Sequence, residues 1–276
     1  MNSIPVIDVS TWRNGSEQER DSIATAVNEA CTKWGFLLVS GHTVSPDLID
    51  RMFAITYEFF DLTEQEKRLY DATGREGGRG YFSLGTKSLA RTRGDANAPG
   101  DQKESFLTGA EAVPDDPYYS AKGADGHFAK NPWPDQPSDM QSVWLEYRHA
   151  CQEVSNCVLS IFARALGMGD DWFESRIDKP ISALVAHHYP EQKVSPSSGA
   201  IRSGAHTDFG SLTLLMTENR PGGLQVMGLD ERWHDIVPLP GAFIVNIGDL
   251  MARWTNDIWR STLHRVVNPP ADAGPD

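Results

Sequence analysis

The sequence has few cysteines and no long apolar run. Its three cysteines, Cys31, Cys151 and Cys157, show no CxxC spacing, which argues against a disulfide framework and against a thiolate zinc site. No stretch approaches the ~18 apolar residues of a membrane span, and the N-terminus lacks the basic and apolar regions of a signal peptide. We therefore expect a cytoplasmic protein without a membrane partner.

Positive charge is also scarce. The chain carries 25 Lys and Arg residues against 38 Asp and Glu residues, a net charge of -13. Such a surface repels the phosphates of nucleic acids and anionic headgroups, so no nucleic-acid partner is expected. A small anionic substrate remains compatible with this charge, because one or two local arginines can bind it.

Apolar residues, in contrast, are sufficient for a sizeable core. They make up 39% of the 276 residues and include 8 Trp, 11 Phe and 7 Tyr. All-β sandwiches and barrels of this length often form one domain, and neither an internal repeat nor a low-complexity linker divides the chain. We expect a single domain over residues 1–276.

Apolar spacing predicts a mainly helical part over residues 1–170. The predicted helices cover 17–34, one starting at Pro46, one opened by the capping box at 63–66, and a long one over 138–167. Two short strands are predicted, at 4–9 and 36–39. Residues 74–137 are rich in Gly, Pro, Asp and Ser, and we expect loops with little regular structure there.

Apolar runs separated by turn residues predict strands after residue 180. These strands cover 183–189, 213–216, 224–227, 242–247 and 261–267. Helices followed by a run of short strands indicate an α+β protein, in which the helices back a β-sandwich or jelly roll formed by residues 171–276.

The segment Gly204–Gly210 carries His206 and Asp208, two residues apart. On a strand both side chains would leave the same face, and His264, in a later β-like run, could join them across the sheet. Two imidazoles and one carboxylate leave three metal positions open, as in non-haem Fe(II) oxygenases. Two positions suit an organic co-substrate and the third suits O₂. A lone His-x-Asp pair is also common on protein surfaces.

Short pieces along the whole chain match one enzyme family in order. They are Ile4-Pro-Val-Ile-Asp8, Trp34-Gly-Phe-Leu-Leu-Val-Ser-Gly-His42, Phe59-Phe60 with Glu66-Lys67, Gly80-Tyr-Phe82, Asp101-Gln-Lys-Glu-Ser-Phe106, Asn131-Pro-Trp-Pro134, His188-Tyr-Pro190, His206-Thr-Asp208, Gly222-Gly-Leu-Gln225, Asn246-Ile-Gly-Asp249 and His264-Arg-Val266. With these pieces the chain resembles the isopenicillin N synthase-like superfamily of Fe(II) oxygenases, most of which depend on 2-oxoglutarate.

The resemblance implies a distorted double-stranded β-helix, a jelly roll, with the N-terminal helices packed on it. It implies that His206, Asp208 and His264 are the metal ligands and catalytic residues, and that Tyr189 helps to hold 2-oxoglutarate. The expected cofactors are Fe(II), 2-oxoglutarate as co-substrate and O₂.

The expected reaction oxidises a small molecule, with succinate and CO₂ as co-products. Hydroxylation, desaturation and ring closure are all compatible with the resemblance, and we expect a role in secondary metabolism. Two alternatives stay open: an oxidase of the isopenicillin N synthase type that uses no 2-oxoglutarate, and an inactive jelly-roll protein that binds a ligand or partner. The oligomeric state is not implied.

One departure from the family lies after His264. The family places an Arg-x-Ser motif on the following strand, where it binds a carboxylate, but here the chain reads Arg265-Val-Val-Asn-Pro-Pro-Ala-Asp-Ala-Gly-Pro-Asp276. We expect a jelly roll trimmed of its last strand rather than a protein without a co-substrate anchor, because a missing strand would expose a sheet edge.

A second departure is His187-His188-Tyr189, where the family often has Asn-Tyr-Tyr. His187 and Tyr189 should share a strand face, so both are candidates for the co-substrate side. We expect packing or hydrogen bonding for the two histidines, with an additional metal role as the alternative.

Basic residues near the expected substrate entrance are candidates for binding a substrate carboxylate. They are Lys87, Arg91 and Arg93 in the irregular segment, and Arg202 just before the strand with His206. Solvated loop charges are the alternative interpretation of all four.

Overall fold

The computed structural model describes residues 3–92, 94, 96–113, 115–124, 126–190, 201–218 and 223–268. Its helices are α1 (Glu17–Lys33), α2 (Pro46–Phe60), α3 (Glu64–Arg68), α4 (Leu89–Thr92), α5 (Met140–Ala165), α6 (Glu174–Ile177) and α7 (Asp249–Trp254). Its strands are β1 (Val6–Asp8), β2 (Phe36–Ser40), β3 (Gly80–Phe82), β4 (Glu104–Gly109), β5 (Ala183–His188), β6 (Ser203–His206), β7 (Leu212–Leu215), β8 (Leu224–Met227), β9 (Trp233–Asp235), β10 (Phe243–Ile247) and β11 (His264–Val266).

These strands form three sheets, with the orders β1-β2-β10-β7, β6-β11-β8-β9 and β3-β4-β5. An apolar cluster joins the first two sheets: Phe36 of β2 and Ile244 of β10 lie in it with Val226 of β8. Strand β2 also buries Leu37 and Val39 in the larger core that includes the helices. Because β2 is covered on both faces, its sequence is a nearly continuous run of apolar residues.

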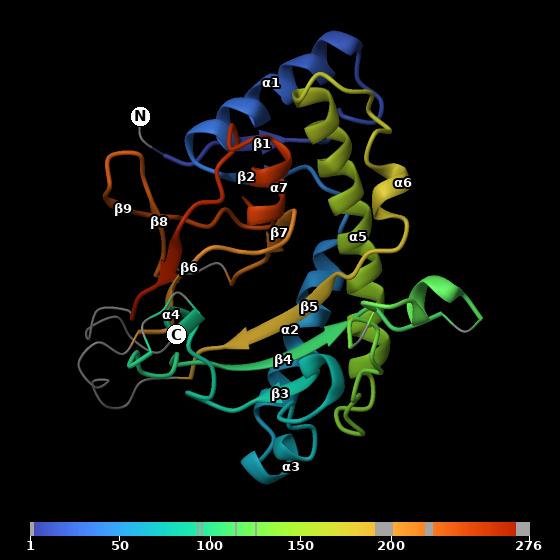
Figure 1. Ribbon diagram of the computed structural model, residues 1–276, viewed down its shortest axis with the longest axis vertical. Coiled ribbons are helices and arrows are strands. Elements are labelled where there is room, and N and C mark those ends of the chain that lie inside the picture. Colours follow the sequence, from blue (N-terminus) through green and yellow to red (C-terminus); the bar gives the residue numbers. More distant parts are fainter. Residues whose placement is uncertain are drawn as a thin grey trace.

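The helices pack on the other face of the first sheet. Figure 1 shows α5 running along one side of the molecule with α1 crossing near its end, and the two helices are in contact. Helix α1 begins at a capping box, in which Ser16 and Glu19 exchange side-chain and backbone hydrogen bonds. Among the described helices, none combines the length and apolar character that crossing a membrane requires.

The prediction of loops over residues 74–137 was wrong in part. Strands β3 and β4 lie there, and β4 pairs along its full length with β5. The strand was missed because it lacks the expected alternation: Glu104, Ser105 and Thr108 are polar, yet all three are buried. Their hydrogen bonds replace the apolar contacts by which a buried strand is usually recognised.

Two strands from the N-terminal part belong to the jelly-roll sheets. Strand β2 pairs with β10, and β1 pairs with β2. The change from helical to strand patterns near residue 170 is therefore not a structural boundary, because the sheet contains strands from both sides of it. The predicted helices at 17–34 and 138–167 are confirmed with small changes of bounds, and the helix predicted to start at Pro46 does so and ends at Phe60. Residues 269–276, where the last strand was expected to be missing, lie outside the described residues.

Candidate active site

Three potential metal ligands meet at the junction of β6 and β11. The ligand atoms of His206, Asp208 and His264 all lie within 4.8 Å of one another. Each histidine Nε2 is 3.8 Å from Oδ1 of Asp208, and the two imidazole centroids are 4.2 Å apart. The structure thus brings together the three side chains that the sequence predicts as ligands.

The pairing of β6 with β11 places the two histidines. The strands are antiparallel, and His264 lies directly opposite His206 in the ladder. Opposite residues in such a pair point to the same side of the sheet, so both imidazoles project together. The ring of Phe36 packs edge-on against His264 at 5.3 Å, which limits how the imidazole can rotate.

Asp208 is not on the strand, contrary to the sequence prediction. Strand β6 ends at His206, and the backbone beyond it is fixed by the start of α7 instead. The N–H of Asp249 donates to the Asp208 carbonyl at 2.7 Å, and the N–H of Leu250 donates to the Phe209 carbonyl at 3.2 Å. The first N–H groups of a helix have no hydrogen-bond partners within the helix. Those of α7 are therefore free to bind the backbone carbonyls of Asp208 and Phe209.

Both histidines are oriented by backbone carbonyls. The Nδ1 of His206 lies 2.8 Å from the Gly204 carbonyl, and the Nδ1 of His264 lies 3.1 Å from the Thr262 carbonyl. A carbonyl accepts hydrogen bonds, so each Nδ1 carries the hydrogen and each Nε2 is left as a metal donor. Burial and the neighbouring His264 lower the pKa of His206 to about 4, which keeps this imidazole neutral at pH 7.

The carboxylate of Asp208 is held through its other oxygen. Oδ2 accepts hydrogen bonds from Thr213 at 2.6 Å and from Asn246 at 2.8 Å. Thr213 of β7 and Asn246 of β10 are cross-strand partners, so their side chains reach the carboxylate from the same side. Burial raises the pKa of Asp208, but His264 and these two hydrogen bonds lower it further, with a net decrease.

The donor set fits Fe(II). Two neutral imidazole nitrogens and one carboxylate oxygen are the facial triad of non-haem Fe(II) oxygenases, and they leave open positions for exchangeable ligands. The supporting contacts use Nδ1 of each histidine and Oδ2 of Asp208, so Nε2 and Oδ1 remain for the metal. Nitrogen and oxygen donors also bind other divalent first-row ions.

Comparison with known proteins agrees with this donor set. Residues 4–136 match the model of the N-terminal region of the non-haem dioxygenases in morphine synthesis, and residues 180–274 match the 2OG-Fe(II) oxygenase superfamily. A 2-oxoglutarate-Fe(II) type oxidoreductase of Aspergillus fumigatus is 33% identical, over 96% of this chain and 77% of its own length. The chain belongs to the 2-oxoglutarate/Fe(II) oxygenase superfamily.

Two further similarities extend this result to the fold and the co-substrate. Validamycin A dioxygenase of Streptomyces hygroscopicus is 31% identical, over 98% of this chain and 73% of its own length. A Neurospora crassa protein crystallised in complex with alpha-KG and thymine is 31% identical, with a TM-score of 0.83, over 98% of this chain and 81% of that chain. The predicted jelly roll and the dependence on iron and 2-oxoglutarate are confirmed, and the chain is a dioxygenase that acts on a small molecule.

In this oxygenase Asn246 and Thr213 hold the carboxylate of Asp208, the candidate metal ligand, and nothing in the sequence indicated that role for either residue. We expect Asn246→Ala to weaken Fe(II) binding about 10- to 100-fold, the usual effect of removing a group that supports a metal ligand. Anaerobic calorimetric titration with Fe(II) would measure the change. Asn156→Ala removes an exposed amide from α5 and should leave the Fe(II) affinity unchanged. Equal affinity in the parent and both variants would show that Asn246 does not support iron binding.

His187 and Tyr189, the candidates for the co-substrate side, lie at the end of β5. The Nδ1 of His187 is 2.7 Å from the Ser105 hydroxyl, and the rings of His187 and Tyr189 are 6.5 Å apart. Burial raises the pKa of Tyr189, so its hydroxyl stays protonated and can donate a hydrogen bond. His188 points elsewhere and interacts with Glu104 at 2.8 Å.

The basic candidates fall into different environments. Arg202 is 4% exposed, and its guanidinium lies 5.4 Å from the Tyr189 ring centroid. Arg91 is exposed and donates to the Ala98 carbonyl at 2.8 Å, a bond that closes its own loop. Lys87 lies over the ring of Phe82 at 3.3 Å. The fourth candidate, Arg93, is outside the described residues.

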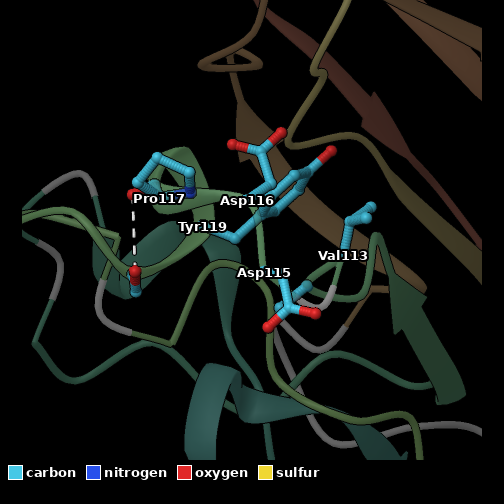
Figure 2. A pocket seen from close by; sticks show the side chains of 7 residues that line it. Val113, Asp115, Asp116, Pro117 and Tyr119 are labelled. Atoms are coloured by element: carbon cyan, nitrogen blue, oxygen red, sulfur yellow. Dashed lines mark hydrogen bonds between the residues drawn. The ribbon is translucent and has the colours of Figure 1, made fainter.

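A surface hollow elsewhere contains none of these candidate residues. It is lined by the segment between Ala112 and Ser120, and Figure 2 shows Asp115, Asp116 and Tyr119 around it. The carboxylate of Asp116 is already paired with Lys179 at 2.6 Å. Within the described residues, the potential metal-binding group His206, Asp208 and His264 lies outside this hollow.

Proposed function

We propose that His206, Asp208 and His264 hold the catalytic Fe(II) of this oxygenase. The observation that carries the proposal is that each of the three residues is oriented by a separate partner. Backbone carbonyls fix the two imidazoles, and Thr213 and Asn246 fix the carboxylate. Such outer contacts are typical of functional metal ligands and are not needed by a surface pair.

Iron bound here supplies O₂ activation coupled to the decarboxylation of 2-oxoglutarate to succinate and CO₂. The chain contributes binding and orientation. Tyr189 and His187 are the residues proposed to contact the co-substrate, since they extend from β5 beside the buried Lys103 and Arg202. The neutral state of His206 and the ionised state of Asp208 are the forms that bind a divalent ion without first losing a proton.

The proposed reaction is oxidation of a C–H bond of a small molecule by hydroxylation, desaturation or ring closure. The relatives named for validamycin A and crystallised with thymine support a polar small-molecule substrate. Neither compound is proposed as the substrate of this chain. The cytoplasmic location and the absence of nucleic-acid and membrane partners remain predictions.

An anaerobic Fe(II) titration with and without 2-oxoglutarate tests the proposed centre. We expect a weak visible charge-transfer band that needs iron, 2-oxoglutarate and His206, and that is absent in His206→Ala. His149→Ala, which removes an exposed imidazole from α5, should keep the band. Iron binding without a band, followed by ring formation without succinate, would indicate the oxidase that uses no 2-oxoglutarate. Failure to bind iron would leave a jelly-roll binding protein.

A further inference from the structure

Lys103 is a buried cation beside β6. It is 7% exposed, and its ammonium group donates to the Ser203 hydroxyl at 2.9 Å. Asp101 lies 3.7 Å away, but its oxygens accept hydrogen bonds from the N–H groups of Gly204 and Leu89 at 3.0 and 3.2 Å. An ammonium group donates three hydrogen bonds, so Lys103 keeps donor capacity beyond Ser203.

The register of β6 turns Ser203 toward the metal ligands. His264 pairs with His206, and Val266 pairs with Ser203. The paired residues are therefore three positions apart in β6 but only two positions apart in β11. His264 and Val266 share a face because they are two apart, and opposite residues point to the same side. The extra residue in β6 is a bulge that re-aims a side chain. Lys103 therefore contacts a side chain on the strand face that carries His206 and His264.

His187 lies on the same side of β4 and β5 as Lys103. Ser105 follows Lys103 by two residues, so it shares its face, and its hydroxyl contacts His187. Lys87 approaches the same region, since its carbonyl accepts a hydrogen bond from the N–H of Asp101 at 2.7 Å. The surrounding protein, followed by the positive charges of Lys103 and Lys87, lowers the pKa of His187 to about 3.

Lys87 has no carboxylate partner among the residues that the structure describes; its ammonium group contacts the ring of Phe82. The residue is exposed, yet burial within the surrounding protein and the charge of Lys103 lower its pKa to about 8. His187 is also exposed to solvent, and burial is likewise the main cause of its lowered pKa. Lys87 and His187 thus retain solvent access, and the charges of Lys87 and Lys103 both act on His187.

We propose that Lys87 and Lys103 form an anion-binding wall beside the iron, and that the small-molecule substrate carries a carboxylate that this wall binds. Lys103 lies 3.7 Å from Asp101 and is also influenced by the charge of Asp208, whereas Lys87 has no carboxylate partner among the described residues, so the charge of Lys87 remains to be balanced. Charge-assisted hydrogen bonds from ammonium groups to a carboxylate are among the stronger polar contacts. The inference rests on the proposed function of the same site, and it adds a substrate class.

Matched acid and amide probes test this proposal. The protein is loaded anaerobically with Fe(II) and saturating 2-oxoglutarate, and the proton NMR line widths of benzoate, phenylacetate and hexanoate are compared with those of their amides. Because 2-oxoglutarate fills its own site, broadening by the paramagnetic iron reports a second carboxylate position. We expect at least one acid to broaden and its amide not to do so. Equal broadening of acid and amide, or none throughout the panel, would overturn the proposal.

Lysine variants test whether Lys87 and Lys103 bind the acid. We expect Lys103→Met and Lys87→Met each to weaken binding of the acid about tenfold or more, the effect of losing a hydrogen bond to a charged group. Lys87→Met keeps the test decisive if Lys103→Met does not fold, because Lys87 makes no described ion pair. Lys122→Met, an exposed lysine, should bind the acid as the parent does.

The charge-transfer band separates this inference from the proposed function. An intact band in both variants, together with weaker acid binding, supports the wall. If Lys103→Met weakens 2-oxoglutarate binding and leaves acid binding unchanged, the lysine serves the co-substrate and the proposal is wrong. A parent protein without the band would contradict the proposed function, and the inference with it.

Discussion

Asp208→Ala is expected to abolish succinate formation and iron binding while leaving the fold intact. The variant removes the single anionic donor and leaves two imidazoles, so the negative charge that attracts the divalent ion is lost. Metal catalysis contributes several kcal/mol of stabilisation, and each 1.36 kcal/mol is a factor of ten. We therefore expect turnover to fall about a thousandfold or more, measured as succinate per mole of protein under saturating 2-oxoglutarate and O₂.

Asp249 provides a matched control for this variant. Its carboxylate belongs to the same loop region, 3.4 Å from the Thr207 hydroxyl, but it is outside the ligand set. Asp249→Asn keeps the N–H that holds the Asp208 carbonyl and removes only a charge. We expect near-parental turnover, and an equal loss in both variants would show that a general charge effect, and not ligation by Asp208, explains the result.

The positions of the two histidines were predictable from sequence because strand pairing acts over long separations in a simple way. Two β-like runs with one histidine each can pair so that the imidazoles face one another, and the His206–His264 pairing does so. The resemblance to known oxygenases specified which two runs would meet. Their role as iron ligands remains a prediction that the variants above test.

The supporting contacts were not predictable in the same way. Asp208 is held by the first N–H groups of α7, a contact that depends on where a distant helix begins. Asn246 lies within a buried apolar strand, and its sequence position gives no sign that it faces Asp208. Lys103 lies in the region predicted as loops, and a bulge in β6, invisible in the residue pattern, brings Ser203 within its reach.

A buried polar network explains why β4 was missed and predicts a large effect on stability. Glu104 accepts hydrogen bonds from Lys67 and His188 at 2.8 Å each, and from the Tyr81 hydroxyl. Lys67 also donates to the Phe60 carbonyl at 2.9 Å. Glu104 and Lys67 are 6% and 7% exposed, so each charge depends on the other for the solvation that water no longer provides.

Glu104→Ala should lower the free energy of unfolding by about 3–5 kcal/mol, because it leaves the buried Lys67 ammonium without its carboxylate. Urea denaturation followed by circular dichroism would measure the change. The double variant Lys67→Met with Glu104→Leu should lose much less, since replacing a whole buried pair by apolar residues is often neutral. Glu146→Ala removes one partner of the exposed Arg51 pair and should cost at most about 1 kcal/mol.

The pH dependence of Glu104→Ala gives an independent test. Burial raises the pKa of Glu104, but hydrogen bonds from His188, Lys67 and Tyr81 lower it below the ordinary 4.5. A carboxylate with a depressed folded-state pKa stabilises the protein above its unfolded-state pKa, and this contribution is lost as the pH falls through the folded-state value. The stability difference between parent and variant should therefore be constant from pH 7 to 5 and shrink below pH 4.5. A difference that stays constant down to the lowest pH at which both proteins fold would show that lost packing, and not the buried charge, determines the effect.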